Sequence, residues 1–462
     1  MEPEFERYSS SLKPLLDASG SRYRHVPYSP FDWTSYPRIF DEGFLPRYSV
    51  EKNRTVGRLG QDQIPLLLLA NLPVKGSSAN LSLARYMISG FCSISRRHEI
   101  LNCMGQFKML AWLADSEKDK IIPRSITSRD SYSVALEMTS NIREIAGSGS
   151  TAGRYMREPE IQFRSALNVC SRMTATGCEL PIDRRDLTHQ AALMHLTSGT
   201  LKSSQVNLAH LFRLRNEEVL AAALEGREGT LTGKEKTKLK QLRNRLKNAK
   251  KTEVFHQDAL NHMEQIYDLE LALHQMSQQT DEKEEKEDIR TKLAQIRAFT
   301  RDIEQKMHRG KLSLLHSRLD DRIAFKMNPP LLQWDHRETE PLVVKEEEFS
   351  PHRQISLIEI TPKVKADKAR AGSKDPESLV IRSLFTTPAD TIIRALDNIA
   401  PGASSALLLR LPSLSDPKKG GRHNLHDLRV RMLSPALLEE LASVVVRWPF
   451  CPERFSPAGF SS

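Results

Sequence analysis

The 462-residue sequence has few cysteines and no long apolar run. Its five cysteines form no Cys-x-x-Cys pair and no cluster with histidine at zinc-ligand spacing, which argues against a disulfide framework and a zinc site. The longest apolar run, Leu66 to Ala70, is far too short to span a bilayer. The opening MEPEFERYSS is acidic rather than arginine-rich, so no transit peptide is indicated. We therefore expect a soluble chain from a reducing compartment.

The charge balance is basic. Lysine and arginine together number 68 against 58 aspartates and glutamates, for a formal net charge of +10. Such a balance favours polyanionic partners such as DNA or RNA, although it also serves solubility alone. Apolar residues make up 39% of the chain, which is enough for several hydrophobic cores.

Residues 1–150 have the composition of an α/β domain. The apolar runs IPLLLLAN and FKMLAWLA are typical of buried strands, and polar helical stretches separate them. The segment GSGSTAG at residues 147–153 has glycines spaced like those of a dinucleotide fingerprint. We interpret it as a flexible linker, because no apolar strand is evident before it and no lysine follows.

Residues 151–327 have the character of a helical insertion, because charged residues dominate there. Apolar residues recur at spacings of three and four on two segments, which predicts two long helices: Leu269, Leu273 and Met276 on the first, and Ile289, Leu293, Ile296, Thr300, Ile303 and Met307 on the second. The acidic QQTDEKEEKED between them is then the tip of an antiparallel coiled-coil hairpin. Upstream, Lys234–Lys251 has nine basic residues and one acid, which fits either a basic arm on nucleic acid or, more commonly, a solvated helix face.

Globular character returns after Asn328. The alternating QISLIEI predicts a strand that brings residues 328–365 back to the α/β domain. The stretches SLVIRSLF, TIIRALDNI and LLEELASVVVRW then predict a small carboxyl-terminal helical domain and tail over residues 366–462.

One short motif carries chemistry. Asn71, Leu72, Pro73 and Val74 follow the first apolar run and so lie where ligands bind in open α/β sheets, at the carboxyl end of a strand. Enzymes that methylate an exocyclic base nitrogen need an acceptor for the amine hydrogens, a neighbouring carbonyl and an aromatic ring that stacks on the flipped base. Asn-Leu-Pro alone is weak, because many strands end in such a turn.

Taken with its surroundings, this motif resembles the Asn-Leu-Pro-Tyr motif of rRNA adenine dimethyltransferases. Val74 stands where that family has its stacking tyrosine, and valine has no π face to hold adenine. The start MEPEFERYSSSLKPLLD resembles the family's second motif, with Glu2 as the acid that binds the ribose of S-adenosylmethionine. The glycine-rich first motif would precede Glu2, so either the chain is truncated there or the cofactor site has been lost.

Further segments resemble the fungal mitochondrial transcription factor B branch of the same superfamily. SPFDWTSYPRIFDE resembles its Asp-Trp run, although Ser29 replaces the aspartate that would meet the cofactor adenine. The segments Gln106–Trp112 and Ser128–Val134 resemble the strand and helix that follow Asn-Leu-Pro. LLQWDHRETEPLVV, QISLIEITP and VVVRWPFCPERF resemble the late strand and closing helix. The resemblance covers about residues 1–145 and 328–462 and does not extend to the insertion between them.

The resemblance implies a class I methyltransferase-like sheet that lacks its first strand. It implies a mitochondrial factor that binds the mitochondrial RNA polymerase and melts promoter DNA, in which the Asn71–Val74 motif and Glu2 are vestigial. No enzymatic activity and no required cofactor are then expected, with S-adenosylmethionine left open as a ligand. The expected nucleic-acid contacts are Lys108, Arg124 and Arg129.

Two alternatives stay open. An active dimethyltransferase of the mitochondrial small-subunit rRNA would use Glu2 and Asn71 with a glycine loop supplied from upstream. A scaffold protein would instead bind another protein through its helical hairpin.

Overall fold

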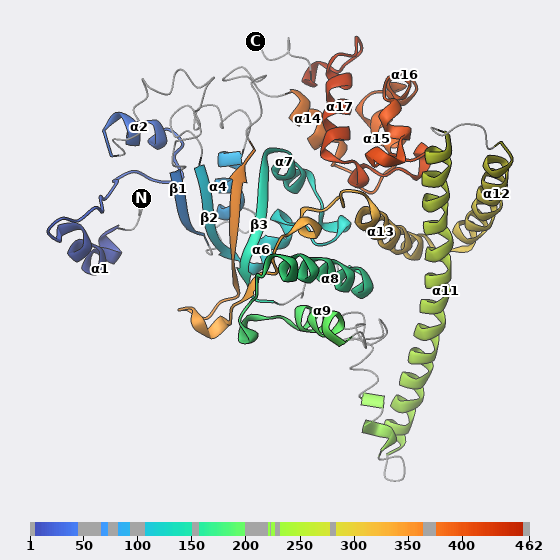
Figure 1. Ribbon diagram of the computed structural model, residues 1–462, viewed down its shortest axis with the longest axis horizontal. Helices are drawn as coiled ribbons and strands as arrows, with labels where there is room; N and C mark the ends of the chain where they lie inside the picture. Colours follow the sequence, from blue (N-terminus) through green and yellow to red (C-terminus); the bar gives the residue numbers. More distant parts are fainter. Residues whose placement is uncertain are drawn as a thin grey trace.

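The computed structural model describes residues 5–44, 66–72, 82–92, 107–149, 157–198, 220–221, 223–226, 232–277, 283–363 and 376–455. Within these ranges the protein is an α/β structure with a mixed five-stranded sheet and mostly helical content (Figure 1). Glu2, Pro73 and Val74 lie outside the described residues.

The sheet has the strand order β1-β2-β5-β3-β4. Its strands are β1 (Leu66–Leu72), β2 (Phe107–Ala114), β3 (Ser140–Gly147), β4 (Leu342–Val343) and β5 (Ile355–Pro362). β1 runs parallel to β2 and β3 runs parallel to β4, whereas β5 lies antiparallel between β2 and β3. The strands predicted from the first two apolar runs and from QISLIEI are therefore confirmed. The last of these returns to the sheet about 200 residues after β3.

One face of the sheet is packed by helices and by the segment that precedes β1. Alternate residues of β2, from Phe107 to Leu113, are buried there against Tyr36, Ile88 and Phe91. The helices of this part are α1 (Phe5–Asp17), α2 (Ser35–Asp41), α4 (Leu83–Cys92), α6 (Asp115–Ile121) and α7 (Ser131–Thr139). On the other face the β1 side chains are open, with Leu67 51% and Leu69 73% exposed.

Trp33, in the segment that resembles the Asp-Trp run, fixes the polypeptide before β1 onto α4. Its indole Nε1 donates to the Tyr86 hydroxyl over 2.9 Å, and its ring packs against Tyr36 and Phe91. A Cβ atom at Gly90 would lie 1.9 Å from this ring, so glycine is needed for the close approach. The role of Trp33 in this structure is packing.

The linker expected at residues 147–153 is corrected in part, because a strand does precede it. β3 ends at Gly147, whereas residues 150–156 lie outside the described ranges. The strand escapes apolar patterning because Glu144 occupies one of its buried positions and a bulge interrupts its pairing between Glu144 and Ala146. A Cβ at Gly147 would meet the Glu144 carboxylate at 2.1 Å, so this glycine makes room for a buried charge.

The middle of the chain is helical. Its helices are α8 (Pro159–Thr176), α9 (Leu187–Ser198), α11 (Gly233–Ser277), α12 (Lys283–Lys306) and α13 (Arg309–Lys326). α12 packs beside the carboxyl-terminal half of α11, as the contacts of Arg297 with Glu270 and of Phe299 with His262 show, so the predicted pair of long helices is confirmed (Figure 1). Leu293, Thr300 and Ile303 of the predicted stripe are buried.

The carboxyl-terminal helices share one hydrophobic core with the insertion. They are α14 (Pro376–Leu384), α15 (Ile392–Ile399), α16 (Ala403–Leu407) and α17 (Pro435–Val446), all from stretches predicted to be helical except α16. A single buried cluster joins Leu260 of α11, Ile303 of α12 and Ile323 of α13 to Leu396 and Leu438. Helices of the insertion (151–327) and of the carboxyl-terminal domain (366–462), which the sequence assigns to separate domains, therefore share buried residues in one cluster.

Asp321 fastens α13 to the short helix η2 (Ile126–Ser128). Its carboxylate accepts hydrogen bonds from the Ser125 hydroxyl over 2.8 Å and from the Ile126 N–H over 2.7 Å. Burial nevertheless raises the pKa of Asp321 to about 6. Because the pKa of this carboxyl group is higher in the folded state than in the unfolded state, the protein is most stable with respect to Asp321 below about pH 4, where the group is protonated in both states. This stabilisation is lost as the pH rises through about 6.

We therefore expect Asp321→Asn to remove a pH-dependent component of stability. Wild-type protein should lose on the order of 2 kcal/mol relative to the variant as the pH rises from about 4.5 to about 7, because only the wild type must ionise a buried carboxyl. Urea midpoints of both proteins, measured across that range, provide the check. Parallel pH profiles would contradict the raised pKa.

Candidate functional site at the carboxyl end of the sheet

Asn71 and Leu72 lie at the carboxyl end of β1. They pair with Trp112 and Leu113 of β2, and the Asn71 side chain is exposed. Asn71 thus has the position predicted for it, at the edge of the sheet where open α/β folds bind ligands. The polypeptide that continues through Pro73 and Val74 lies outside the described residues, so the complete motif has no described geometry.

A buried charge network closes the neighbouring strand ends. The Lys118 ammonium, only 1% exposed, lies 2.7 Å from Asp115 Oδ1 and 3.1 Å from Glu144 Oε1. Arg124 Nη2 lies 2.7 Å from the other Glu144 oxygen, and the Ser356 hydroxyl donates to Asp115 over 2.6 Å. The network joins α6 to β3 and β5, so it holds together three elements that are distant in sequence.

The pKa values of two neighbouring acids, Asp115 and Asp119, shift in opposite directions. Burial disfavours ionised Asp115, but the Lys118 ammonium and the hydrogen bonds from Lys118 and Ser356 outweigh it, so the pKa of Asp115 lies below its ordinary value. Burial dominates at Asp119 and raises the pKa of that carboxyl despite the nearby Arg124 and Lys118.

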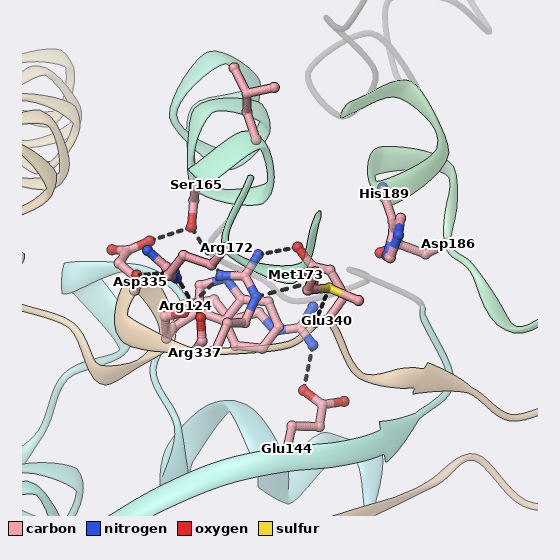
Figure 2. Close-up of polar contacts among 12 residues, drawn as sticks. Arg124, Glu144, Ser165, Arg172, Met173, Asp186, His189, Asp335, Arg337 and Glu340 are labelled. Carbon is pink, nitrogen blue, oxygen red and sulfur yellow. Dashed lines mark hydrogen bonds and ion pairs between the residues drawn. The ribbon is translucent and has the colours of Figure 1, made fainter. Parts of the chain in front are cut away.

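Trp334, in the short helix η6 (Gln333–His336), is held between two guanidinium groups. The Cζ atom of Arg124 lies 4.0 Å from the ring centroid and that of Arg337 lies 3.9 Å from it. Each arginine also has an acid partner, Glu144 for Arg124 and Glu340 for Arg337 (Figure 2). The acids leave both cations neutralised as well as stacked.

The same cluster fastens α8 to the segment before β4. Arg157 binds both oxygens of Asp335 over 2.7 and 2.8 Å, and the Ser165 hydroxyl donates to Asp335 over 2.6 Å. Arg172 donates to the backbone carbonyls of Asp335 and Arg337 (Figure 2). Burial works against ionised Asp335, but the Arg157 guanidinium and the hydrogen bonds from Arg157 and Ser165 hold the pKa of its carboxyl below the ordinary value.

Asp186 and His189 lie beside this cluster at the start of α9 (Figure 2). The Asp186 carboxylate accepts a hydrogen bond from the backbone N–H of His189 over 2.6 Å and so caps the helix. Burial raises the pKa of Asp186 and lowers that of His189. The His189 Nδ1 atom is buried and has no hydrogen-bond partner among the described residues.

The three expected nucleic-acid contacts do not form one surface. Lys108 lies near the amino end of β2, away from Asn71, and its partly exposed ammonium pairs with Glu359 over 2.6 Å. Arg124 belongs to the buried network at the opposite end of the sheet. Neither residue is placed beside the Asn-Leu-Pro turn by the contacts of the described residues.

The expectation for Arg129 is corrected. Its side chain is buried, with two guanidinium nitrogens bound to Glu137 and a third donating to the carbonyls of Arg431 and Leu433 over 2.6 and 2.8 Å. A group enclosed in this way has no surface to offer to a phosphate. Arg129 instead joins α7 to the carboxyl-terminal helices.

Sequence patterns gave no warning of the buried network. The i, i+3 pair of Asp115 and Lys118 looks like an exposed helical ion pair, and Glu144 looks like a surface residue.

Ser29, singled out because it replaces an expected aspartate, is exposed, and its hydroxyl accepts from the Phe31 N–H over 3.3 Å.

Three comparisons, with models of known protein families, with curated proteins and with solved structures, find no match. In the part of the chain that the structure describes, no group of three or more histidine, cysteine or acidic residues is arranged to hold a metal ion. Nor does any helix in the described ranges have the length and apolarity needed to cross a membrane.

Proposed function

We propose that this chain is a transcription initiation factor that binds the mitochondrial RNA polymerase and stabilises melted promoter DNA. The observation that carries the proposal is the sheet, in which one antiparallel strand, β5, enters between β2 and β3 while the other strands run in a common direction. Such a mixed α/β sheet is compatible with the class I methyltransferase-like fold that the resemblance implies. Asn71 and Leu72 also end β1 as the resemblance to the dimethyltransferase superfamily requires.

The loss of catalysis in this proposal rests on substitutions in the sequence. Val74 replaces the ring on which adenine would stack, and Ser29 replaces the acid expected at the cofactor adenine. Binding of a melted DNA strand needs only contacts to its phosphate backbone and stacking of its bases. A nucleic-acid groove can therefore keep its binding function after the methyl-transfer site has been lost. Mitochondrial localisation and the polymerase partner follow from the resemblance and are part of the proposal.

Run-off transcription tests the proposal directly. The chain is added to the cognate mitochondrial RNA polymerase on duplex promoter templates and on templates melted in advance around the start site. We expect initiation on duplex DNA to depend on the chain by at least about tenfold, and initiation on the melted template to depend on it little, because melting is the step it assists. Equal output with and without the chain on both templates would contradict the proposal.

An active rRNA adenine dimethyltransferase is the second candidate, favoured by the exposed Asn71 at the carboxyl end of β1. Transfer of a labelled methyl group from S-adenosylmethionine to small-subunit rRNA would identify it. In that case Asn71→Ala should lower transfer by about 100-fold or more, since it removes a polar group that positions the target amine. Asn141→Ala, at an exposed position of β3, is the matched control.

A further inference from the structure

The amino-terminal part of α11 presents an exposed basic surface, which we call the basic arm and define as residues 234–251. Lys236, Lys240 and Lys247 are exposed and follow one another at steps of four and seven residues, so they lie along one side of the helix. With a rise of about 1.5 Å per residue, those steps space the Cα atoms of the three lysines by about 6 and 10 Å along the helix axis. The result is a line of positive charge.

A separate side of the same helix is already packed. Leu239, Leu242 and Leu246 form a small apolar cluster with Ala221 and Leu224. This contact supports the basic arm from one side and leaves the lysine side in solvent. In Figure 1 the same end of α11 projects beyond α9, away from the sheet and from the carboxyl-terminal helices.

Neighbouring acids do not neutralise the lysines. Arg243 is bound to Glu225 over 2.8 Å, and the Glu235 carboxylate accepts hydrogen bonds from the Thr232 N–H and hydroxyl at the start of the helix. Within the described residues, by contrast, Lys236, Lys240 and Lys247 form no ion pair.

The acids of the hairpin lie at its other end. α12 begins with the acidic sequence KEEKED, close to the carboxyl end of α11 (Figure 1). The separation by most of the length of a 45-residue helix is far greater than a Debye length of about 8 Å, so this acidic end does not cancel the charge of the basic arm.

We propose that the basic arm binds the phosphate backbone of nucleic acid through Lys236, Lys240 and Lys247. A line of unpaired lysines that neutralises successive phosphates releases counterions and binds without regard to base sequence. Phe255, half exposed just beyond the basic arm, adds a ring on which an unpaired base can stack. The proposal that the basic arm binds a phosphate backbone is argued from this geometry alone, whereas the proposal that it acts on promoter DNA rests on the proposed function.

The test compares two triple variants of the full chain. Lys236→Gln/Lys240→Gln/Lys247→Gln removes the free lysines and keeps good helix formers. The control, Arg290→Gln/Lys292→Gln/Lys306→Gln, removes the same charge from exposed α12 residues that already pair with Glu287, Asp288 and Asp302. Binding to labelled duplex DNA, single-stranded DNA and duplex RNA is measured by fluorescence anisotropy at several salt concentrations, with anionic phospholipid vesicles as a separate arm.

We expect the basic-arm variant to bind at least one nucleic acid about 10- to 100-fold more weakly at about 0.1 M salt. The slope of log affinity against log salt concentration should fall in magnitude by about 3, because three phosphate contacts are lost. The control variant should keep the wild-type affinity and slope. Phe255→Ala should weaken single-stranded binding selectively, by about tenfold. Nucleic-acid binding that is unchanged, that falls equally in both triple variants, or that is unaffected while vesicle binding falls would overturn the proposal.

The run-off assay separates the two proposals. If initiation never depends on the chain but the basic-arm variant loses affinity for nucleic acid, the basic arm stands and the transcription proposal fails. If initiation depends on the chain and both triple variants bind and initiate as wild type does, the basic-arm proposal fails alone.

Discussion

Replacement of Arg129 by methionine is expected to lower the free energy of unfolding by about 3–5 kcal/mol, because it leaves a buried charge uncompensated. Glu137, also buried, would lose its guanidinium partner, and the carbonyl oxygens of Arg431 and Leu433 would lose their donor. Urea denaturation followed by circular dichroism measures the change. Methionine fills most of the volume, so the effect reports lost polar contacts rather than a cavity.

Lys108→Gln is the matched control for this experiment. Its ammonium is partly exposed and paired with Glu359, so its loss should cost no more than about 1 kcal/mol. Nucleic-acid affinity, measured where both variants are folded, should be unchanged in Arg129→Met. A variant with wild-type stability and lost affinity would restore Arg129 as a nucleic-acid contact and would contradict the buried arrangement.

Asp320→Asn is expected to destabilise the protein by a similar amount, about 3–5 kcal/mol, since one buried carboxylate compensates two arginines. Asp320 Oδ1 lies 2.8 Å from Arg429 Nη1, and its Oδ2 lies 2.8 Å from Arg431 Nε. These bonds cross from α13 to the segment between α15 and α17. Asn keeps the shape of the side chain but offers no negative charge to either guanidinium.

The readout for Asp320→Asn is hydrogen exchange, with Asp302→Asn as the control because its ion pair with Lys306 is exposed. Amides of α13 and of the carboxyl-terminal helices should lose protection together, since they share one core. Loss of protection in α13 alone would mean that the insertion unfolds as a separate domain.

The Arg129 and Asp320 interactions are coupled through Arg431. Arg129 donates to the backbone carbonyl of Arg431, whose side chain binds Asp320. The two substitutions together should therefore cost less than the sum of their separate effects.

Deletion of the insertion cannot test its function cleanly, because α11, α12 and α13 supply part of the carboxyl-terminal core.

The sequence by itself determined the elements whose pattern is local. Apolar runs identify β1 and β2, alternation identifies β5, and spacings of three and four identify the long helices α11 and α12. These signals survive because each strand or helix buries a face that its own residues define. The position of Asn71 at the end of a strand follows from the same local reading.

Only the tertiary structure decided what the charged residues do. The sequence did not predict β3, because a buried Glu144 interrupts its apolar pattern. Glu144 can be buried there because Lys118 and Arg124 from other parts of the chain pair with its carboxylate. Arg129 binds Glu137 and two backbone carbonyls instead of a phosphate, whereas Lys236, Lys240 and Lys247 form no ion pair among the described residues. A charge takes its role from the partners that folding brings to it, and those partners lie far away in the sequence.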